Sequence, residues 1–521
     1  MLPVKSIHFI FLYLISFLPI NAINSFDESI CPSGKQSYEY LMSNAVHPFA
    51  LSVGTSLSQT HISENTINPE YVRKQMLKIA KKMGPLEGEK WLRAESRIWY
   101  LLRAMPEYSC INGHNIHVAT LDLEHRDIAV KDILSDLEHN QELQLKKCPL
   151  CQEKIDFQRE QQDLFTVDIQ DKIAGLVHYL NIDLLKLKQI PNMRISIEIA
   201  DILKSGTTEI DDKKLENLTS FIKKLGNPMI FFHHYANPIQ LSNLFEKQEH
   251  AEWFANICAR IIEKLPNITH VCPISQPTGF VFRVTRNQDL PPFEYTVEQD
   301  KLLENIMKAS ALASDKMKNV RDKNSKDVKL NVLVSHQWKI MIPKHSYYDP
   351  RYALELLVTT IADKMYNGKF VSAVQPYISK FDGIALSVYP SLKFDMWKPD
   401  GSNILGEVDY QGSLGAVIET NKAFADKDIY IVEAGCNNAD PKIKKEYIDM
   451  MLCVCARARY LGIPVKSLYF WAITNHPDFY MEWNTARGVT YFAPFDDLNI
   501  ESINQGGKYL KEIIESVKQD F

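Results

Sequence analysis

Several short apolar runs of the chain end in side chains that are able to hold a ligand. His234 lies in the run 229–236, Gln276 follows the run 270–274, Glu433 lies in the run 429–435, and Trp471 lies in the run 468–473. Imidazole, amide and carboxylate groups hydrogen-bond to hydroxyls, and an indole face packs against C–H groups. The combination favours a neutral, ring-shaped ligand such as a sugar, and it does not resemble a metal site.

Each of these side chains also has a purely structural interpretation. A lone buried carboxylate such as Glu433 could be a core residue paired with Arg194. His234 could be a satisfied structural histidine, and Trp471 an ordinary packing aromatic. The other polar or aromatic side chains near the ends of apolar runs are Gln59, Asn237, Ser275, His336, Trp338 and Tyr389.

The apolar runs predict the elements that must position these groups. Strands buried on both faces of a parallel sheet are almost continuously apolar, as are the eight runs 49–57, 193–200, 229–236, 270–274, 330–336, 383–390, 429–435 and 468–473. Amphipathic stretches lie between them, and a repeated strand-then-helix order indicates parallel β/α units. The predicted fold class is α/β, a closed (β/α)8 TIM barrel, in which functional groups gather at the carboxyl ends of the strands.

An open, doubly wound sheet is the alternative, but no glycine-rich fingerprint follows the first predicted strand. The first run ends near Ser58 and the second begins near Met193, so we expect a long insertion after the first strand. A connection of that length must carry structure of its own. We therefore predict a barrel over residues 46–517 with an insertion over 88–170.

Six motifs, in order, resemble those of glycoside hydrolase family 1, the β-glucosidase family. GTSLSQ resembles the end of the first family strand and aligns Gln59 with a sugar-binding glutamine. MRISIEI aligns Arg194 with the arginine beside the catalytic nucleophile, and HYANP aligns His234 with a sugar-binding histidine. The resemblance covers about residues 46–60 and 175–517 and implies the same barrel fold.

The other three motifs carry the rest of the implied site. GIALSVY aligns Tyr389 with the tyrosine that bonds the nucleophile, and IVEAG makes Glu433 the candidate nucleophile itself. WAITNHPDF aligns Trp471 with the aromatic platform beneath the sugar ring and Asp478 with a sugar-binding glutamate. Glu482 and Trp483 form a second candidate for the family's Glu-Trp pair.

One position departs from the family in a way that bears on catalysis. The family's fourth strand ends in Asn-Glu-Pro, with Glu as general acid/base, whereas this chain has Ser275, Gln276 and Pro277. Glutamine has no titratable proton to donate. Myrosinases, a plant branch of the family, also have Gln there and cleave thioglucosides. The resemblance implies a retaining glycoside hydrolase acting on small β-glycosides, through O- or S-glycosidic bonds, without the usual acid. The alternative is a catalytically impaired barrel that binds carbohydrate or another partner.

The insertion contains a separate group of potential metal ligands. Cys148 and Cys151 form a Cys-x2-Cys turn, whose spacing allows two thiolates to bind one Zn²⁺, and Cys110 and His114 could complete a tetrahedral site. The pattern is similar to half of a RING or U-box module. A disulfide and free buried thiols remain open alternatives. We expect catalysis itself to need no cofactor.

Composition and the amino-terminal segment limit the partners and the compartment. The 521 residues carry 59 Lys+Arg against 64 Asp+Glu, a net charge of −5, which argues against nucleic-acid binding through bulk positive charge. Residues 1–22 resemble a signal peptide, with Lys5 before an apolar stretch. We expect a secreted or periplasmic protein with no membrane contact after cleavage, or a membrane-anchored one without it. The expected ligand is a small glycoside or oligosaccharide.

Overall fold

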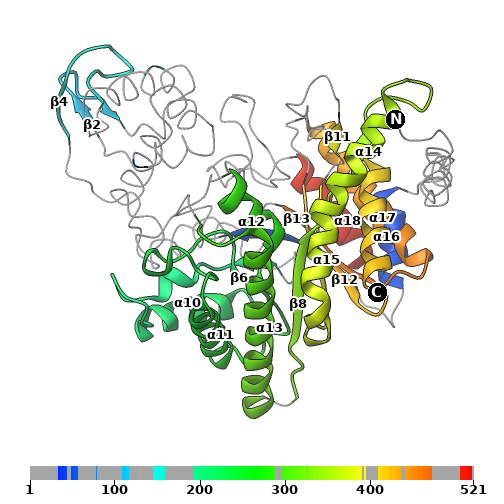
Figure 1. Cartoon of the computed structure of the whole chain (residues 1–521), viewed down its shortest axis with the longest axis horizontal. Helices are drawn as coiled ribbons and strands as arrows, with labels where there is room; N and C mark the ends of the chain where they lie inside the picture. The colour runs from blue at the N-terminus through cyan, green and yellow to red at the C-terminus, as the bar shows by residue number, and fades with distance from the viewer. Residues whose placement is uncertain are drawn as a thin grey trace, which may run out of the picture.

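Most of the chain forms a barrel of strands surrounded by helices (Figure 1). The structure is a computed structural model. It describes the residues 33–43, 49–56, 78, 108–116, 128, 145–158, 193–287, 295–325, 327–389, 392–394, 409–435, 440–471 and 505–518.

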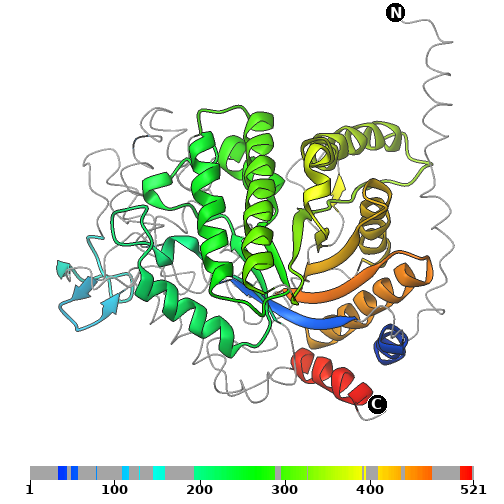
Figure 2. The same ribbon diagram turned by 90° about the horizontal axis from the view of Figure 1, so that it is seen from below.

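Eight parallel strands close into a barrel in sequence order, β1 pairing with both β5 and β13. The strands are β1 (Ala50–Ser56), β5 (Arg194–Ser196), β6 (Met229–His233), β7 (His270–Ile274), β8 (Asn331–Gln337), β10 (Gly383–Val388), β12 (Asp428–Ala434) and β13 (Val465–Trp471). Each strand overlaps one predicted run. The (β/α)8 barrel prediction is therefore confirmed, and Figure 2 shows the first strand, in blue, meeting the last ones, in orange.

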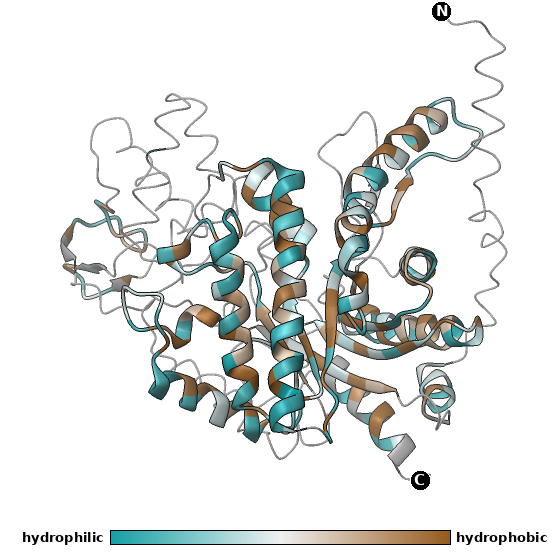
Figure 3. Ribbon diagram, turned by 60° about the horizontal axis from the view of Figure 1, so that its bottom comes forward, coloured by the Kyte–Doolittle hydropathy of each residue, from teal (hydrophilic) through white to brown (hydrophobic). Residues whose placement is uncertain are grey.

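The strands are apolar because both of their faces are covered. Side chains from six strands fill the interior of the barrel as one cluster: Met229, Phe231, Cys272, Leu333, Ala385, Val432 and Tyr469. The intervening side chains, such as Ile230 and Phe232 of β6, belong to the larger cluster packed against the helices. This alternation is the two-residue period of a β-strand, and Figure 3 shows brown, apolar residues along the strands and on parts of the helices.

Helices follow the strands and cover the outside of the barrel. Helix α10 (Asp212–Lys224) begins where the Asp211 carboxylate accepts hydrogen bonds from the backbone N–H groups of Lys213 and Lys214, a normal N-cap. The other helices are α2 (Gly34–Ser43), α11 (Gln248–Glu263), α12 (Pro277–Phe282), α13 (Gln299–Asn324), α14 (Tyr352–Asp363), α15 (Lys369–Val374), α16 (Tyr410–Ala423), α17 (Pro441–Tyr460) and α18 (Gln505–Lys518). None of the described helices combines the length and apolarity needed to cross a bilayer.

Between β1 and β5 the chain forms a small sheet separate from the barrel. Its antiparallel strands β2 (Tyr108–Cys110), β3 (Asn115–Ile116) and β4 (Ile155–Gln158) pair in the order β3-β2-β4. Figures 1 and 2 both show this sheet at the edge of the molecule, away from the barrel strands. The insertion after the first strand is thus present, while its bounds at 88 and 170 lie outside the described residues and stay a prediction.

Candidate active site

Glu433 lies near the carboxyl end of β12, where a β-bulge changes the direction of the side chains. Leu386 of β10 pairs with Ile431 of β12, but the next pair joins Ser387 to Glu433, so Val432 is the extra residue. In a regular strand Val432 and Glu433 would face opposite sides of the sheet. Because a bulge re-aims the side chains around it, Val432 fills the barrel interior while Glu433 still reaches partners across the barrel.

A buried ion pair fixes the Glu433 carboxylate. Nη2 of Arg194 lies 2.8 Å from Oε1 of Glu433, and the two side chains are 0% and 2% exposed. The guanidinium carbon lies 4.1 Å from the ring centroid of Phe231 and 4.5 Å from that of Trp471. Burial lowers the pKa of Arg194, and the charge of Glu433 opposes that shift. Since a guanidinium keeps its proton in proteins, Arg194 stabilises Glu433 as an anion.

Arg194 lies at the amino end of its strand, whereas the other groups of the site lie near carboxyl ends. It is the first residue of β5, opposite Gly54 of β1, and Gly54 is also opposite Trp471 at the end of β13. Strands in a closed barrel are staggered, so the start of one can be level with the end of another. The long side chain of Arg194 then reaches the mouth.

Gly54 is the residue that permits this close approach. A Cβ at this position would lie 3.1 Å from Cδ of Arg194 and 3.1 Å from Cε3 of Trp471. Glycine in a strand often marks such a contact. The backbone of β1 therefore forms one wall against which the arginine and the indole pack.

Two further side chains donate hydrogen bonds to the Glu433 carboxylate. The Tyr389 hydroxyl, directly after β10, donates to Oε2 of Glu433 at 3.0 Å. Nε2 of Gln276, which follows β7, donates to the same oxygen. The side chains of residues 276 and 433 thus meet across the mouth of the barrel, and the carboxylate accepts hydrogen bonds from three side chains.

The amide of Gln276 is held at both ends. Its Oε1 accepts a hydrogen bond from the Tyr235 hydroxyl at 2.8 Å, and its Nε2 donates to Oγ of Ser387 at 3.0 Å as well as to Glu433. Its backbone N–H donates to Oγ of Ser335 at 3.1 Å. An amide has two N–H groups and one carbonyl, so this network turns the NH2 end toward Glu433.

Gln276 and Tyr235 also share an uncommon backbone conformation. Their φ angles are 42° and 69°, in the left-handed region that non-glycine residues rarely adopt. Each such residue costs on the order of 1–3 kcal/mol unless its surroundings hold it in place, and such residues cluster at functional sites. The side chains of the two strained residues are hydrogen-bonded to each other.

His234, Trp471 and Ser275 lie beside the carboxylate network. The ring centroids of His234 and Trp471 are 5.5 Å apart at 54°, and Nδ1 of His234 lies 2.9 Å from Oγ of Ser196. Oγ of Ser275 accepts a hydrogen bond from Nη2 of Arg194 at 3.4 Å. The structure therefore brings together seven of the eleven predicted catalytic and substrate-binding residues, and the other four lie outside the described residues: Gln59, Asp478, Glu482 and Trp483.

Two nearby histidines have structural roles. Nε2 of His336 lies 2.9 Å from Oδ1 of Asn367, and its ring stacks on Phe370 with centroids 4.0 Å apart. Nε2 of His233 lies 2.8 Å from Oδ1 of Asn237. Burial lowers the pKa of His336 to about 3 and that of His233 to about 4. His336 and Asn237, both read as strand-end polar residues, are thus engaged in the packing of the barrel.

Sequence reasoning missed four residues that hold the site together: Ser196, Tyr235, Ser335 and Ser387. Three are small hydroxyl side chains inside runs that are otherwise apolar, and all three are fully buried. A serine that interrupts a buried strand needs a hydrogen-bond partner, and this signal could have identified them. Tyr235 had no comparable signal, because its role depends on the left-handed turn after β6.

Of the cysteines, one clustered set and one disulfide stand out. The ligand atoms of Cys110, His114, Cys148 and Cys151 lie within 4.8 Å of one another. Cys453, in α17, is disulfide-bonded. Cys455 is free and buried.

The geometry around Glu433 suits nucleophilic attack more than proton transfer. A buried anion beside an indole and an imidazole can add to an electrophilic carbon while its charge stays balanced by Arg194. The amide of Gln276, which contacts Glu433, has no acidic proton to give to a leaving group.

No protein-family model and no curated protein sequence matches the chain. Solved structures do match. A β-glycosidase from Pyrococcus horikoshii aligns with a TM-score of 0.54 at 17% identity, covering 65% of this chain and 85% of that one. A family 1 β-glucosidase from Thermotoga maritima gives 0.53 at 14%, covering 69% and 89%. The virulence factor SghA, in complex with its substrate analogue salicin, gives 0.59 at 15%, covering 93% and 98%.

At these identities the comparisons establish the fold alone. The closed barrel is similar to that of family 1 β-glycosidases over most of their length. The chain therefore has a β-glycosidase-like TIM barrel.

Proposed function

We propose that this protein is a retaining glycoside hydrolase of the β-glucosidase type, with Glu433 as nucleophile. The observation that carries the proposal is the buried Glu433 carboxylate, which accepts hydrogen bonds from Arg194, Tyr389 and Gln276 at the mouth of the barrel. A retaining enzyme needs such an ionised, oriented carboxylate to form a covalent glycosyl–enzyme intermediate. The similarity to β-glycosidase folds supports this chemistry by analogy.

The remaining residues would bind the sugar. His234 and Trp471 lie in contact with each other beside Arg194, which suits an imidazole donor and a platform beneath the ring. The other sugar-contact candidates are Gln59, Ser275, Asp478, Glu482 and Trp483. SghA is described with the substrate analogue salicin, which supports a small glycoside as the ligand class here.

Gln276 would restrict the first chemical step to good leaving groups. Glu433 Oε attacks the anomeric carbon while the glycosidic bond breaks, and the leaving group departs with the bonding electron pair. Without a proton from residue 276, that group must be stable as an anion. General acid–base assistance is worth about 10²–10⁴-fold, so alkyl glycosides would react slowly and the intermediate would hydrolyse slowly as well.

A second candidate function is carbohydrate binding without turnover. One observation favours it: both N–H groups of Gln276 donate within the protein, to Ser387 and Glu433. The hydrogen bond to Glu433 would have to lengthen before that oxygen could attack a sugar. A barrel that kept this contact in the complex would hold a glycoside without cleaving it.

The two functions differ in what an activated substrate does. A dinitrophenyl β-glucoside should release about one equivalent of phenolate per chain in a burst, and mass spectrometry should find the glycosyl group on the peptide that contains Glu433. Glu433→Gln should abolish the burst. A barrel that binds glucose, with saturable quenching of tryptophan fluorescence but no burst, would contradict the enzyme proposal.

Gln276→Glu tests whether the acid/base is the missing part. We expect hydrolysis of alkyl β-glucosides to rise by about 10²–10⁴-fold, with a bell-shaped pH profile. The matched control is Gln248→Glu, the same chemical change at an exposed position of α11, which should leave the rate unchanged. If Gln276→Glu changes nothing in a folded protein, the site does not perform this reaction.

The compartment stays a prediction, because the predicted signal peptide lies outside the described residues. The disulfide at Cys453 is of the kind that persists in oxidising compartments, which supports export.

A further inference from the structure

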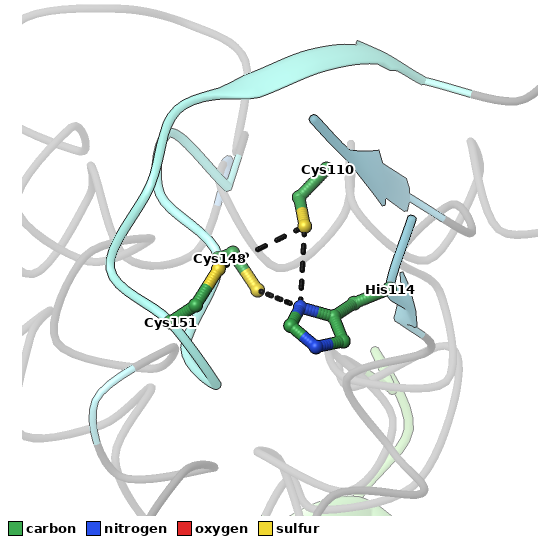
Figure 4. Close-up of side chains that lie close together, drawn as sticks. All are labelled: Cys110, His114, Cys148 and Cys151. Atoms are coloured by element: carbon green, nitrogen blue, oxygen red, sulfur yellow. Dashed lines mark hydrogen bonds between the residues drawn. The ribbon is translucent and has the colours of Figure 1, made fainter. Parts of the chain in front are cut away.

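The small sheet between β1 and β5 carries two tight turns that present four side chains to one point. The first turn runs from Cys110 to His114, with Gly113 at φ 78° and its N–H donating to the Cys110 carbonyl at 2.9 Å. The second runs from Cys148 to Gln152, with Gln152 at φ 62° and its N–H donating to the Cys148 carbonyl at 2.7 Å. Figure 4 shows the three sulfurs and the imidazole of His114 converging.

The separations between these atoms are those of a tetrahedral metal site. Cys110 Sγ lies 3.3 Å and Cys148 Sγ 3.6 Å from Nδ1 of His114, and the Sγ atoms of Cys110 and Cys151 are 3.8 Å apart. With Zn–S of about 2.3 Å and Zn–N of about 2.0 Å, tetrahedral ligands lie about 3.8 Å (S to S) and about 3.5 Å (S to N) apart. One nitrogen atom faces two sulfurs, which is the arrangement expected around a shared central ion.

A hydrogen-bond donor lies beside one of the sulfurs, as is common around metal thiolates. The side-chain amide of Asn112 donates to Cys151 Sγ at 3.5 Å. Such outer contacts orient the ligands and stabilise negative charge on sulfur.

The sheet has little apolar burial to order it. Of the side chains described in 108–116 and 145–158, the buried apolar ones are Ile116, Leu145 and the cysteines Cys110 and Cys148, whereas Ile111 and Leu150 are 52% and 42% exposed. Its strands are two to four residues long, too short to be stable as an isolated sheet. A bound ion that joins both turns would supply stability that packing does not, as in small metal-dependent modules.

We propose that Cys110, His114, Cys148 and Cys151 bind one Zn²⁺ ion in a closed, structural site of three thiolates and one imidazole. Four protein ligands leave no open coordination position, which distinguishes a structural from a catalytic zinc. Tetrahedral thiolate and imidazole ligands also suit zinc better than the oxygen-preferring cations.

The geometry disfavours the two alternatives. A disulfide needs sulfurs about 2.05 Å apart, whereas Cys110 and Cys151 are at 3.8 Å. A disulfide between any two of the cysteines would also leave the third thiol and His114 without an ion to bind. Free thiols that face one another in an oxidising compartment would be prone to oxidation, and a bound ion would protect them.

The test uses the full chain, purified, reduced under anaerobic conditions, supplied with one equivalent of ZnSO4 and passed through metal-free gel filtration. We expect mass spectrometry of the elements to find about one zinc per chain. Co²⁺ supplied instead should give thiolate-to-cobalt charge-transfer bands and the intense visible bands of a tetrahedral site. No retained zinc, or an octahedral cobalt spectrum, would overturn the proposal.

Variants then assign the ligands. Cys148→Ser with Cys151→Ser should lose zinc, and His114→Ala should lose it while His114→Cys restores it as a site of four thiolates. The matched control is Cys258→Ser, which removes a free buried thiol from α11 and should keep the full zinc content. Zinc retained by the double variant, or a disulfide between two of the three cysteines in the protein as purified with no zinc uptake after reduction, would refute the site. The wild-type cobalt spectrum decides the matter even if a variant fails to fold.

Discussion

The two clusters of functional side chains in this molecule are assembled in different ways. Around Glu433 the partners come from distant parts of the sequence: Arg194 is 239 positions away and Gln276 157 positions away. In the small sheet, His114 follows Cys110 by four positions, and Cys151 follows Cys148 by three. The barrel brings its cluster together by strand pairing, whereas the small sheet uses two local turns.

The clusters also differ in how their charge is balanced. The barrel supplies both members of the Arg194–Glu433 ion pair. The cysteine cluster brings three sulfurs and one imidazole together, and a bound cation would balance the charge of their thiolates. The site around Glu433 therefore depends on the fold of the barrel, whereas the proposed zinc site depends on the bound ion.

The largest effect should come from breaking the buried ion pair. Glu433→Leu leaves the Arg194 charge buried without its carboxylate, which should lower the free energy of unfolding by about 3–5 kcal/mol. The double variant Arg194→Met with Glu433→Leu should lose less than the single one, because both charges are gone. Urea unfolding measures this.

The control for the ion pair is an exposed one. Lys204→Met breaks the surface pair with Glu209 and should leave the unfolding midpoint unchanged. The single variant Arg194→Met completes the cycle. If the double variant loses as much stability as the sum of Arg194→Met and Glu433→Leu, the two charges do not stabilise each other.

The next effect is the pH dependence of the stability of the barrel. His233 and His336 have pKa values lowered by burial to about 4 and about 3, against about 6.5 in an unfolded chain. Their contribution is complete above pH 6.5 and is lost as the pH falls toward 4, because the unfolded chain then binds protons that the folded one excludes. At pH 4, each histidine should have lowered the free energy of unfolding by about 3 kcal/mol.

This pH dependence should be measured by urea unfolding between pH 7 and pH 4.5 in the presence of a chelator, so that proton-driven metal loss does not contribute. His233→Gln should flatten the acid side of the profile. A barrel whose stability is constant down to pH 4.5 would show that these histidines are not excluded from protons as the structure indicates.

A smaller effect should follow from Gly54→Ala. The added Cβ would meet Arg194 and Trp471 at 3.1 Å, which should cost about 1–3 kcal/mol and reduce any burst with activated glycosides. Gly415→Ala is the control: its Cβ would meet Ile340 at 3.8 Å, an ordinary contact, in helix α16. That change should be neutral or slightly stabilising in thermal unfolding, and equal losses for both would remove the role given to Gly54.

The smallest effect should be that of metal removal on the barrel. Chelation should expose residues 108–116 and 145–158 to proteases but shift the unfolding of the barrel by less than about 0.5 kcal/mol, as for changes away from a core. Near-UV circular dichroism can follow the barrel and limited proteolysis the small sheet. A chelator that unfolds both together would show that the two regions are one cooperative unit.

Much of the barrel could be predicted because its signal is local. Each buried parallel strand needs an apolar run, and the runs 229–236 and 383–390 mark β6 and β10 within a few residues. The spacing Cys-x2-Cys likewise places two ligands on one turn whatever surrounds it. Only the choice between a metal, a disulfide and free thiols required the distances between the turns.

The contacts of the barrel site could not be predicted in the same way. The bulge at Val432, the left-handed backbone of Tyr235 and Gln276, and the stagger that brings Arg194 level with Trp471 are not visible in any run of residues. Each results from how neighbouring strands pair in a closed barrel.

The sequence by itself determined which groups are available: a carboxylate at 433, an amide where an acid would be expected, and two close-spaced ligand pairs in the insertion. Side-chain chemistry and the periodicity of buried strands are local properties, so the order of residues is enough to read them. The tertiary structure alone decided that the amide of Gln276 turns its NH2 end toward Glu433, because its oxygen accepts a hydrogen bond from Tyr235 and its nitrogen also donates to Ser387. Tyr235 follows β6, Ser387 lies in β10 and Glu433 lies in β12, and these elements meet only when the barrel closes.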